Sequence, residues 1–223
     1  MRESKEAVAG LVLAAGRSTR MGEPKPLLEI DGRTFLQAAV EALRDGGCET
    51  VTAVIASPDA AFAARSAGAA IAQGRPDGEQ IDSLRSGLDA LDALDAVDDA
   101  LEGAPHDAPD GARQGRVDAV VVLPVDHPRV RPATIGTLIS AWRAEPEAMV
   151  RPVHRGRPGH PTLFPRRIWA ALRDPALPDG ARSVVEAGPV VDVPVDDPGV
   201  LVDIDTPADY REHAGDGHPD GPS

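Results

Sequence analysis

One segment near the start of the chain, residues 8–28, constrains the fold most. Residues 8–13 form a compact apolar run that contains a glycine, and this pattern predicts a short buried strand rather than a helix. Small residues follow at Ala14, Ala15 and Gly16, so backbone N–H groups at this point can approach a ligand closely. The chain therefore begins with a strand and a loop typical of α/β proteins that bind ligands at strand ends.

Three cations come after the small residues, at Arg17, Arg20 and Lys25. Exposed amides and positive charge directly after a strand predict a site for polyphosphate. The alternative is a glycine-rich surface turn with solvated charges, and Arg17 in particular fits a solvated or structural arginine. Short phosphate motifs often match by chance, so this loop alone leaves both interpretations open.

Composition supports an α/β domain and excludes several classes of partner. Of the 223 residues, 42% are hydrophobic but only 3% are aromatic, so the core must consist of Ala, Val, Leu and Ile. Such a core is typical of strands that are buried on both faces. The net charge of −13 argues against a nucleic acid or an anionic membrane as a partner.

The chain length predicts one domain, over residues 1–212, followed by a polar tail at 213–223 that we expect to be disordered. A single cysteine, Cys48, excludes an intramolecular disulfide and is interpreted as a packing residue. The charged N-terminus has no apolar signal core, and no apolar run is long enough to span a membrane. We therefore expect a cytoplasmic protein.

Strand and helix patterns alternate along the chain, as in a mostly parallel βαβ sheet. Further strands are predicted at 51–56, 69–72, 118–124, 148–153, 160–164, 190–195 and 200–204. Helices are predicted after Thr34, at 60–66, from 81 to about 97, after Pro132, at 165–172 and after Thr206. The helix after residue 80 carries aspartates that we expect to form a solvated face, and residues 102–116 are predicted to be a flexible acidic insert.

Aspartates lie at two predicted strand ends. Asp126 follows the most convincing central strand, and ligands of open α/β sheets bind at the carboxyl ends of strands. Asp203 and Asp205 end the last predicted strand and are two residues apart, so both side chains can lie on one face.

Several motifs occur in an order that resembles the MobA-like nucleotidyltransferases, across roughly residues 8–212. They are Leu13-Ala-Ala-Gly-Arg-Ser-Thr-Arg-Met-Gly22 with Lys25, Asp82-Ser-Leu-Arg-Ser-Gly-Leu88, Leu123-Pro-Val-Asp-His-Pro128, Gly159-His-Pro-Thr-Leu-Phe164, Gly180-Ala-Arg182 and Asp203-Ile-Asp-Thr-Pro207. The fourth and last motifs resemble the molybdenum cofactor cytidylyltransferase, or MocA-like, branch. The resemblance implies a three-layer, Rossmann-like sheet of the nucleotide-diphospho-sugar transferase type.

The resemblance also implies an enzyme and its substrates. The reaction is Mg²⁺-dependent transfer of a nucleotide from a nucleoside triphosphate, CTP by this branch, to a phosphorylated acceptor, with release of pyrophosphate. The acceptor is a molybdopterin-type cofactor, and a molybdoenzyme or its chaperone is a further implied partner.

The same resemblance assigns roles to individual residues. Arg20 contacts the β- and γ-phosphates, Lys25 contacts the α-phosphate, and Asp126 holds Mg²⁺, with Asp205 as the preferred second ligand and Asp203 as the alternative. The motifs place these residues at the nucleotide: Leu13, Ala14, Ala15, Gly16, Arg17, Ser83 and Gly87. They place Gly159, His160 and Arg182 at the acceptor, although Arg182 also fits a plain salt bridge.

Two features depart from the family pattern and leave the acceptor open. His127 follows Asp126 where relatives commonly have Met or Gln, and the insert at 102–116 has no assigned counterpart. The open alternatives are a sugar-phosphate or other small-phosphate nucleotidyltransferase, a MocA-like oxidoreductase, and a non-catalytic cofactor-delivery protein. The sequence has no Gly-x-Gly-x-x-Gly with an acidic ribose ligand, which argues against the oxidoreductase.

Overall fold

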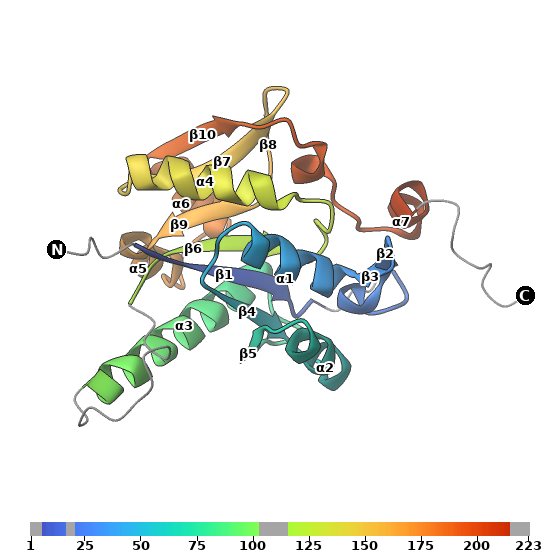
Figure 1. Cartoon of the computed structure of the whole chain (residues 1–223), viewed down its shortest axis with the longest axis horizontal. Helices are drawn as coiled ribbons and strands as arrows, with labels where there is room; N and C mark the ends of the chain where they lie inside the picture. Colours follow the sequence, from blue (N-terminus) through green and yellow to red (C-terminus); the bar gives the residue numbers. More distant parts are fainter. Residues whose placement is uncertain (1–5, 17–20, 103–115, 215–223) are drawn as a thin grey trace, which may run out of the picture.

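The computed structural model describes residues 6–16, 21–102 and 116–214 (Figure 1). Its centre is an eight-stranded sheet with the order β10-β7-β9-β6-β1-β4-β5, in which β8 pairs with β7. The strands are β1 (Ala7–Ala14), β4 (Thr50–Ile55), β5 (Ala70–Gln73), β6 (Val117–Pro124), β7 (Met149–His154), β8 (Arg157–Pro158), β9 (Thr162–Pro165) and β10 (Val190–Pro194). A separate hairpin pairs β2 (Glu29–Ile30) with β3 (Arg33–Thr34).

The sheet is mostly parallel, as predicted. Strand β1 pairs in parallel with β4 and β6, β4 with β5, and β7 with β10. Strand β9 runs antiparallel to both β6 and β7. The carboxyl ends of β1, β4 and β6 therefore meet at one edge of the sheet.

Helices cover both faces of the sheet, which gives three layers (Figure 1). One face packs against α1 (Phe35–Asp45), α2 (Pro58–Ser66) and α4 (Pro132–Ala144), and the other packs against α3 (Gln80–Glu102), α5 (Trp169–Leu172) and α6 (Ala181–Ala187). Within β1, Val8 and Val12 belong to the first core cluster, whereas Leu11 and Leu13 belong to the second. This alternation explains why an apolar run without polar breaks forms a strand.

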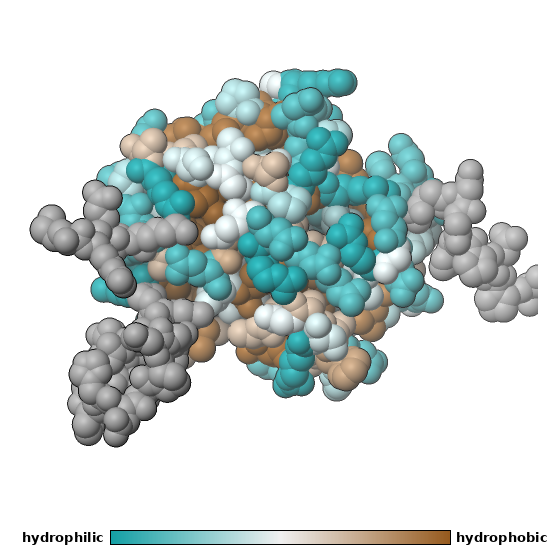
Figure 2. Space-filling view, in the orientation of Figure 1, coloured by the Kyte–Doolittle hydropathy of each residue, from teal (hydrophilic) through white to brown (hydrophobic). Residues whose placement is uncertain are grey.

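Local sequence signals place the helix starts. The Thr34 side chain accepts a hydrogen bond from Gln37 N, and the Gln37 side chain accepts one from Thr34 N, which is a capping box at the start of α1. Pro132 occupies the first turn of α4. Hydrophilic and weakly polar side chains cover the outward faces of α1 and α4 (Figure 2).

The strand predicted at 200–204 is wrong. Residues Pro198–Leu201 form a short 3-10 helix, η3, and the chain after it is extended but unpaired in the sheet. Asp197 is the reason, because its buried carboxylate accepts hydrogen bonds from Gly199 N at 3.0 Å and from Thr134 Oγ1 at 2.7 Å. This cap turns the backbone before Val200, so its apolar residues pack without a strand partner.

The solvated acidic face predicted for α3 is also wrong for two of its aspartates, Asp92 and Asp95, whereas Asp89 is exposed. Asp89 and Asp92 contact Arg173, which follows α5, while Asp92 and Asp95 contact Arg166 in η2 (Arg166–Ile168). The apolar stripe ends earlier than predicted, because Leu94 and Val97 are exposed. The C-terminal part of α3 extends away from the sheet (Figure 1).

Some predictions fall on residues outside the described ranges. These are residues 103–115 of the expected acidic insert and residues 215–223 of the expected tail; His213 and Ala214 instead end helix α7 (Pro207–Ala214). In the described part of the chain, no helix combines the length and apolar character needed to cross a membrane.

Candidate functional site

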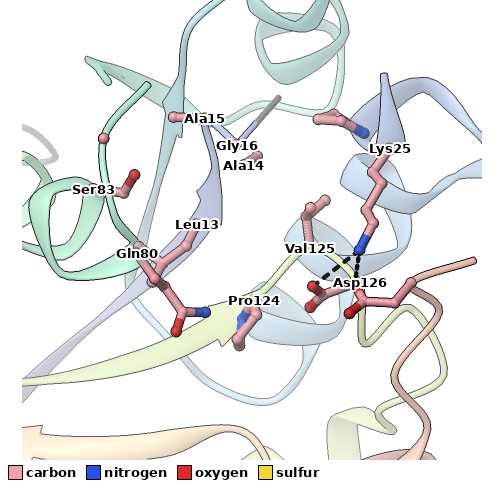
Figure 3. Close-up of a pocket in the computed structure, with 13 residues that line it drawn as sticks. Leu13, Ala14, Ala15, Gly16, Lys25, Gln80, Ser83, Pro124, Val125 and Asp126 are labelled. Atoms are coloured by element: carbon pink, nitrogen blue, oxygen red, sulfur yellow. Dashed lines mark hydrogen bonds and ion pairs between the residues drawn. The ribbon is translucent and has the colours of Figure 1, made fainter. Parts of the chain in front are cut away.

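A cavity of about 310 Å³ lies where the carboxyl ends of β1 and β6 meet, and we call it the β1-loop cavity. Leu13, Ala14, Ala15 and Gly16 line one wall. Ser83 and Gln80 approach from α3, and Lys25 and Asp126 lie on the opposite wall (Figure 3). The predicted loop, its lysine and the aspartate after β6 therefore share one cavity.

Lys25 joins the two strand-end carboxylates that the sequence singled out. Its Nζ lies 3.4 Å from Asp126 Oδ2 and also forms an ion pair with Asp205 Oδ1. Only 12% of the lysine side chain is exposed, and the residue begins the short helix η1 (Lys25–Leu27). A largely buried ammonium that faces a cavity can neutralise an anionic ligand that enters it.

A backbone hydrogen bond holds the segment at residues 203–205 against the end of β6. Ile204 N donates to Asp126 O at 3.0 Å, which fixes Asp203 and Asp205 beside the end of β6. Burial, followed by the charges of Asp126 and Asp205, raises the pKa of Asp203 to about 6. Burial also raises the pKa of Asp126, and Lys25 opposes this shift. A concentration of carboxylates with raised pKa values favours a bound cation.

Two histidines pack beside this carboxylate group. The ring centroids of His127 and His160 are 4.7 Å apart. Burial lowers the pKa of each ring to about 4, so both imidazoles are neutral near pH 7 and each keeps one nitrogen lone pair for a ligand.

A second cavity of about 630 Å³ adjoins the first, and we call it the α6 cavity. Gly159, His160 and Arg182, the residues predicted at the acceptor, all line it. Arg182 also forms an exposed ion pair with Glu186, with Nε and Oε1 2.7 Å apart. Leu13, Gln80 and Pro124 line both cavities, so the two are neighbours along one edge of the sheet.

The remaining predicted residues lie in different places. Ser83 is buried in the first turn of α3 and lines the β1-loop cavity. Gly87 is buried between α3 and β1 instead, where a Cβ would lie 2.5 Å from the Leu11 side chain. Arg17 and Arg20 lie outside the described residues.

Sequence reasoning missed several polar residues that line the cavities, among them Gln80 and Arg151. Gln80 begins α3 and lines both cavities, and its only local signal was its place at the end of a polar loop. Arg151 of β7 lines the α6 cavity and pairs with Asp192, with Nε and Oδ1 2.6 Å apart. No local pattern separates Arg151 from any other strand arginine.

The carboxylate group also fits a divalent metal ion. Asp126, His127 and Asp203 each offer one ligand atom, and these atoms lie within 4.8 Å of one another. Asp126 Oδ1 is buried and has no hydrogen-bond partner among the described residues. Buried polar atoms normally have a partner, so this oxygen fits a ligand position.

Comparison with known sequences identifies relatives over most of this architecture. The MobA-like NTP transferase domain profile matches residues 10–193. A protein of Opitutus terrae described as a probable molybdenum cofactor guanylyltransferase is 32% identical over 151 residues. This match covers 68% of the chain and 63% of that protein. A shorter match of 59 residues, 42% identical, links 26% of the chain to 29% of the nicotine blue oxidoreductase of Paenarthrobacter nicotinovorans.

Solved structures share the fold. Rv0371c from Mycobacterium tuberculosis H37Rv is 27% identical, with a TM-score of 0.68, over 93% of this chain and 97% of that one. A complex of the same mycobacterial protein with manganese is 25% identical, with a TM-score of 0.65, over 94% of this chain and 99% of that one. The profile match and this shared architecture establish that the chain belongs to the MobA-like NTP transferase family of nucleotidyltransferases.

Proposed function

We propose that the protein transfers CMP from CTP to a molybdopterin-type cofactor phosphate and releases pyrophosphate. One observation carries this proposal: two cavities adjoin at the carboxyl edge of the sheet and share Leu13, Gln80 and Pro124. The β1-loop cavity has the cation and backbone amides that suit a triphosphate, and the larger α6 cavity suits an acceptor.

The proposed reaction is attack on the α-phosphorus. A phosphate oxygen of the acceptor forms the new bond, the bond between the α-phosphorus and the β-bridging oxygen breaks, and pyrophosphate leaves with the electron pair. Such transfer depends mainly on positioning and charge neutralisation. Lys25 faces the β1-loop cavity, so in the proposal it stabilises the negative charge that develops on the α-phosphate. Arg20 is assigned the β- and γ-phosphates.

A divalent cation is part of the proposal, and Mg²⁺ is the ion that the family resemblance implies. Asp126 and one or both of Asp203 and Asp205 would hold it, and when bound it would neutralise the triphosphate and the departing pyrophosphate. The carboxylate group at the end of β6 and the manganese complex of the mycobacterial relative support this part.

The choice of CTP rests on the resemblance of the Gly159-His-Pro element to cytidylyltransferases. His160 of this element lines the α6 cavity, so the same residues also support a pterin-phosphate acceptor there. The Opitutus terrae relative is described as a guanylyltransferase, which makes GTP the competing donor. Delivery of the product to a molybdoenzyme or its chaperone completes the proposal.

The first test measures nucleotide choice and turnover in the full-length protein. Thermal shift with CTP, GTP, ATP and UTP, each with Mg²⁺ or Mn²⁺, should show the largest rise in Tm with CTP, because a ligand that binds the native state stabilises it. Pyrophosphate release should then require both CTP and molybdopterin-type cofactor. We expect Lys25→Met and Asp126→Asn to lower kcat/KM by about a hundredfold or more, as the loss of a charge-stabilising group does.

Asp45→Asn, at an exposed carboxylate at the end of α1, is the matched control and should retain wild-type turnover. Full activity in the Lys25 and Asp126 variants would contradict the proposed site. Tight CTP binding with background pyrophosphate release would identify a non-catalytic delivery protein instead. Release with GTP alone would reassign the donor, and release with a sugar phosphate would reassign the acceptor.

A further inference from the structure

The two oxygens of the Asp126 carboxylate have different surroundings. Oδ2 faces Lys25 Nζ at 3.4 Å, and the same ammonium contacts Asp205. Oδ1 is buried without a hydrogen-bond partner in the described part of the chain, and it lies 3.9 Å from His127 Nε2. The carboxylate therefore has two sides. Oδ2 faces Lys25 and Asp205, which we call the lysine side, and Oδ1 faces His127, which we call the histidine side.

His127 is held on that second side by the backbone. Its N–H donates to Pro124 O at 3.2 Å, in the turn that follows β6. The residue is only 7% exposed, and within the described residues its Nδ1 has no hydrogen-bond partner. The ring nitrogen that faces the Asp126 carboxylate is Nε2, and its lone pair can bind an ion beside Oδ1.

Asp203 completes a three-residue group on the histidine side. One ligand atom each from Asp126, His127 and Asp203 lies within 4.8 Å of the others. Bonds of about 2.1 Å to a metal place opposite ligands about 4.2 Å apart, so small side-chain movements would suffice to enclose an ion. Asp205 contributes to the neighbouring lysine contact and is not needed for this group.

The donor set indicates which ion the group prefers. Mg²⁺ favours oxygen ligands and retains several waters. An imidazole nitrogen in the ligand set favours first-row transition ions, for which the affinity of mixed nitrogen and oxygen sites rises from Mn²⁺ onward. We propose that His127 is a metal ligand together with Asp126 and Asp203, and that this site selects a first-row transition ion such as Mn²⁺ over Mg²⁺. This inference rests on the proposed function for one point, which is that a metal ion binds beside the nucleotide.

His160 supports His127 from the other side. The two rings pack at 4.7 Å with a tilt of 55°, and His160 lines the α6 cavity. The His127 ring thus lies between the metal ligands and the cavity assigned to the acceptor. His160 is a second buried imidazole in contact with His127, which makes it the necessary comparison in a test.

The experiment is pulsed electron paramagnetic resonance of Mn²⁺ bound to the purified full-length protein, without substrate. We expect electron spin-echo modulation from a directly bound ¹⁴N nucleus in the wild type. His127→Met, which removes both ring nitrogens at similar side-chain size, should abolish the modulation, and His160→Met should preserve it. By calorimetry, His127→Met should weaken Mn²⁺ binding by about tenfold or more, as loss of metal-site support does, and should change Mg²⁺ binding much less.

A mutation-free measurement guards against a variant that fails to fold. Labelling the histidines of the wild type with ¹⁵N should replace the ¹⁴N modulation by a ¹⁵N pattern. Absence of nitrogen coupling in the wild type, or its persistence in His127→Met, would overturn the inference. Turnover with CTP and acceptor but no nitrogen coupling would leave the proposed function standing and refute the inference. Nitrogen coupling without pyrophosphate release would support the metal site and contradict the proposed function.

Discussion

At the scale of single residues, Gly159 packs closely against the backbone of Val200, beside the cavity proposed for the acceptor. A Cβ at this position would lie 2.2 Å from Val200 O and 2.8 Å from the Val200 carbonyl carbon. Gly159 N donates to Pro152 O at 2.9 Å, and His160 N donates to Val200 O at 2.9 Å. The absence of a side chain therefore lets η3 fix the backbone of His160.

We expect Gly159→Ala to lower the free energy of unfolding by about 1–3 kcal/mol, because the added methyl must displace backbone atoms. Displacement of His160 should also raise the KM for the acceptor more than the KM for the nucleotide. Urea denaturation and steady-state kinetics measure the two effects.

Gly136→Ala is the matched control. Its Cβ would meet Gly46 O at an ordinary 3.5 Å inside α4, so we expect unchanged or higher stability, by up to about 1 kcal/mol. Equal unfolding midpoints for Gly159→Ala and the wild type would show that the contact with Val200 does not restrict this position.

At the scale of elements, charge pairing attaches α3 to the segment after β9. Arg166 NH1 contacts Asp95 Oδ2 at 2.5 Å and donates to Val117 O at 2.9 Å, and its guanidinium also pairs with Asp92. Arg166 lies over the Trp169 ring, 4.7 Å from its centroid. This arrangement explains why α3 carries aspartates on a face that packs against the protein.

We expect Arg166→Met to destabilise the protein by about 2–3 kcal/mol, because it leaves the buried Asp95 carboxylate without a counterion. Adding Asp95→Asn to this variant should recover part of the loss. Denaturant unfolding of the single and double variants measures both effects.

Arg173→Met is the comparison for that measurement. It removes a more exposed partner of Asp89 and Asp92, so we expect a loss below about 1 kcal/mol. Equal losses for Arg166→Met and Arg173→Met would contradict the distinction between a buried and a surface ion pair.

At the scale of the whole molecule, the proposed function depends on two cavities side by side rather than on one pocket. The β1-loop cavity lies at the ends of β1 and β6, whereas the α6 cavity lies between α3, β9 and α6. Ala181, in the first turn of α6, lines the α6 cavity but not the β1-loop cavity. The two substrates can therefore be separated by mutation.

We expect Ala181→Trp to fill part of the α6 cavity and to lower kcat/KM for the acceptor by about a hundredfold, since misplacing one reactant costs that much. The Kd for the nucleotide, measured by calorimetry, should remain unchanged. Ala187→Trp, at the exposed end of α6, controls for the bulk of the new side chain. A parallel loss of nucleotide affinity in Ala181→Trp would show that the two cavities form one site.

Much of the fold and part of the site follow from local patterns. The apolar run at 8–13, the cap at Thr34 and the β-branched run at 118–124 correspond to β1, α1 and β6 because each depends on neighbours along the chain. The loop after β1, Lys25 and Asp126 could be selected because strand ends in α/β sheets point to one edge.

Only the tertiary structure decided which of these residues meet. The pairing of Lys25 with Asp205, of Asp95 with Arg166, and of His127 with Asp203 depends on strand order and on the course of η3. These contacts join residues far apart in the chain, and local periodicity carries no information about them. The sequence by itself therefore determined the elements and the chemistry available at their ends, whereas long-range packing determined the shape of the site.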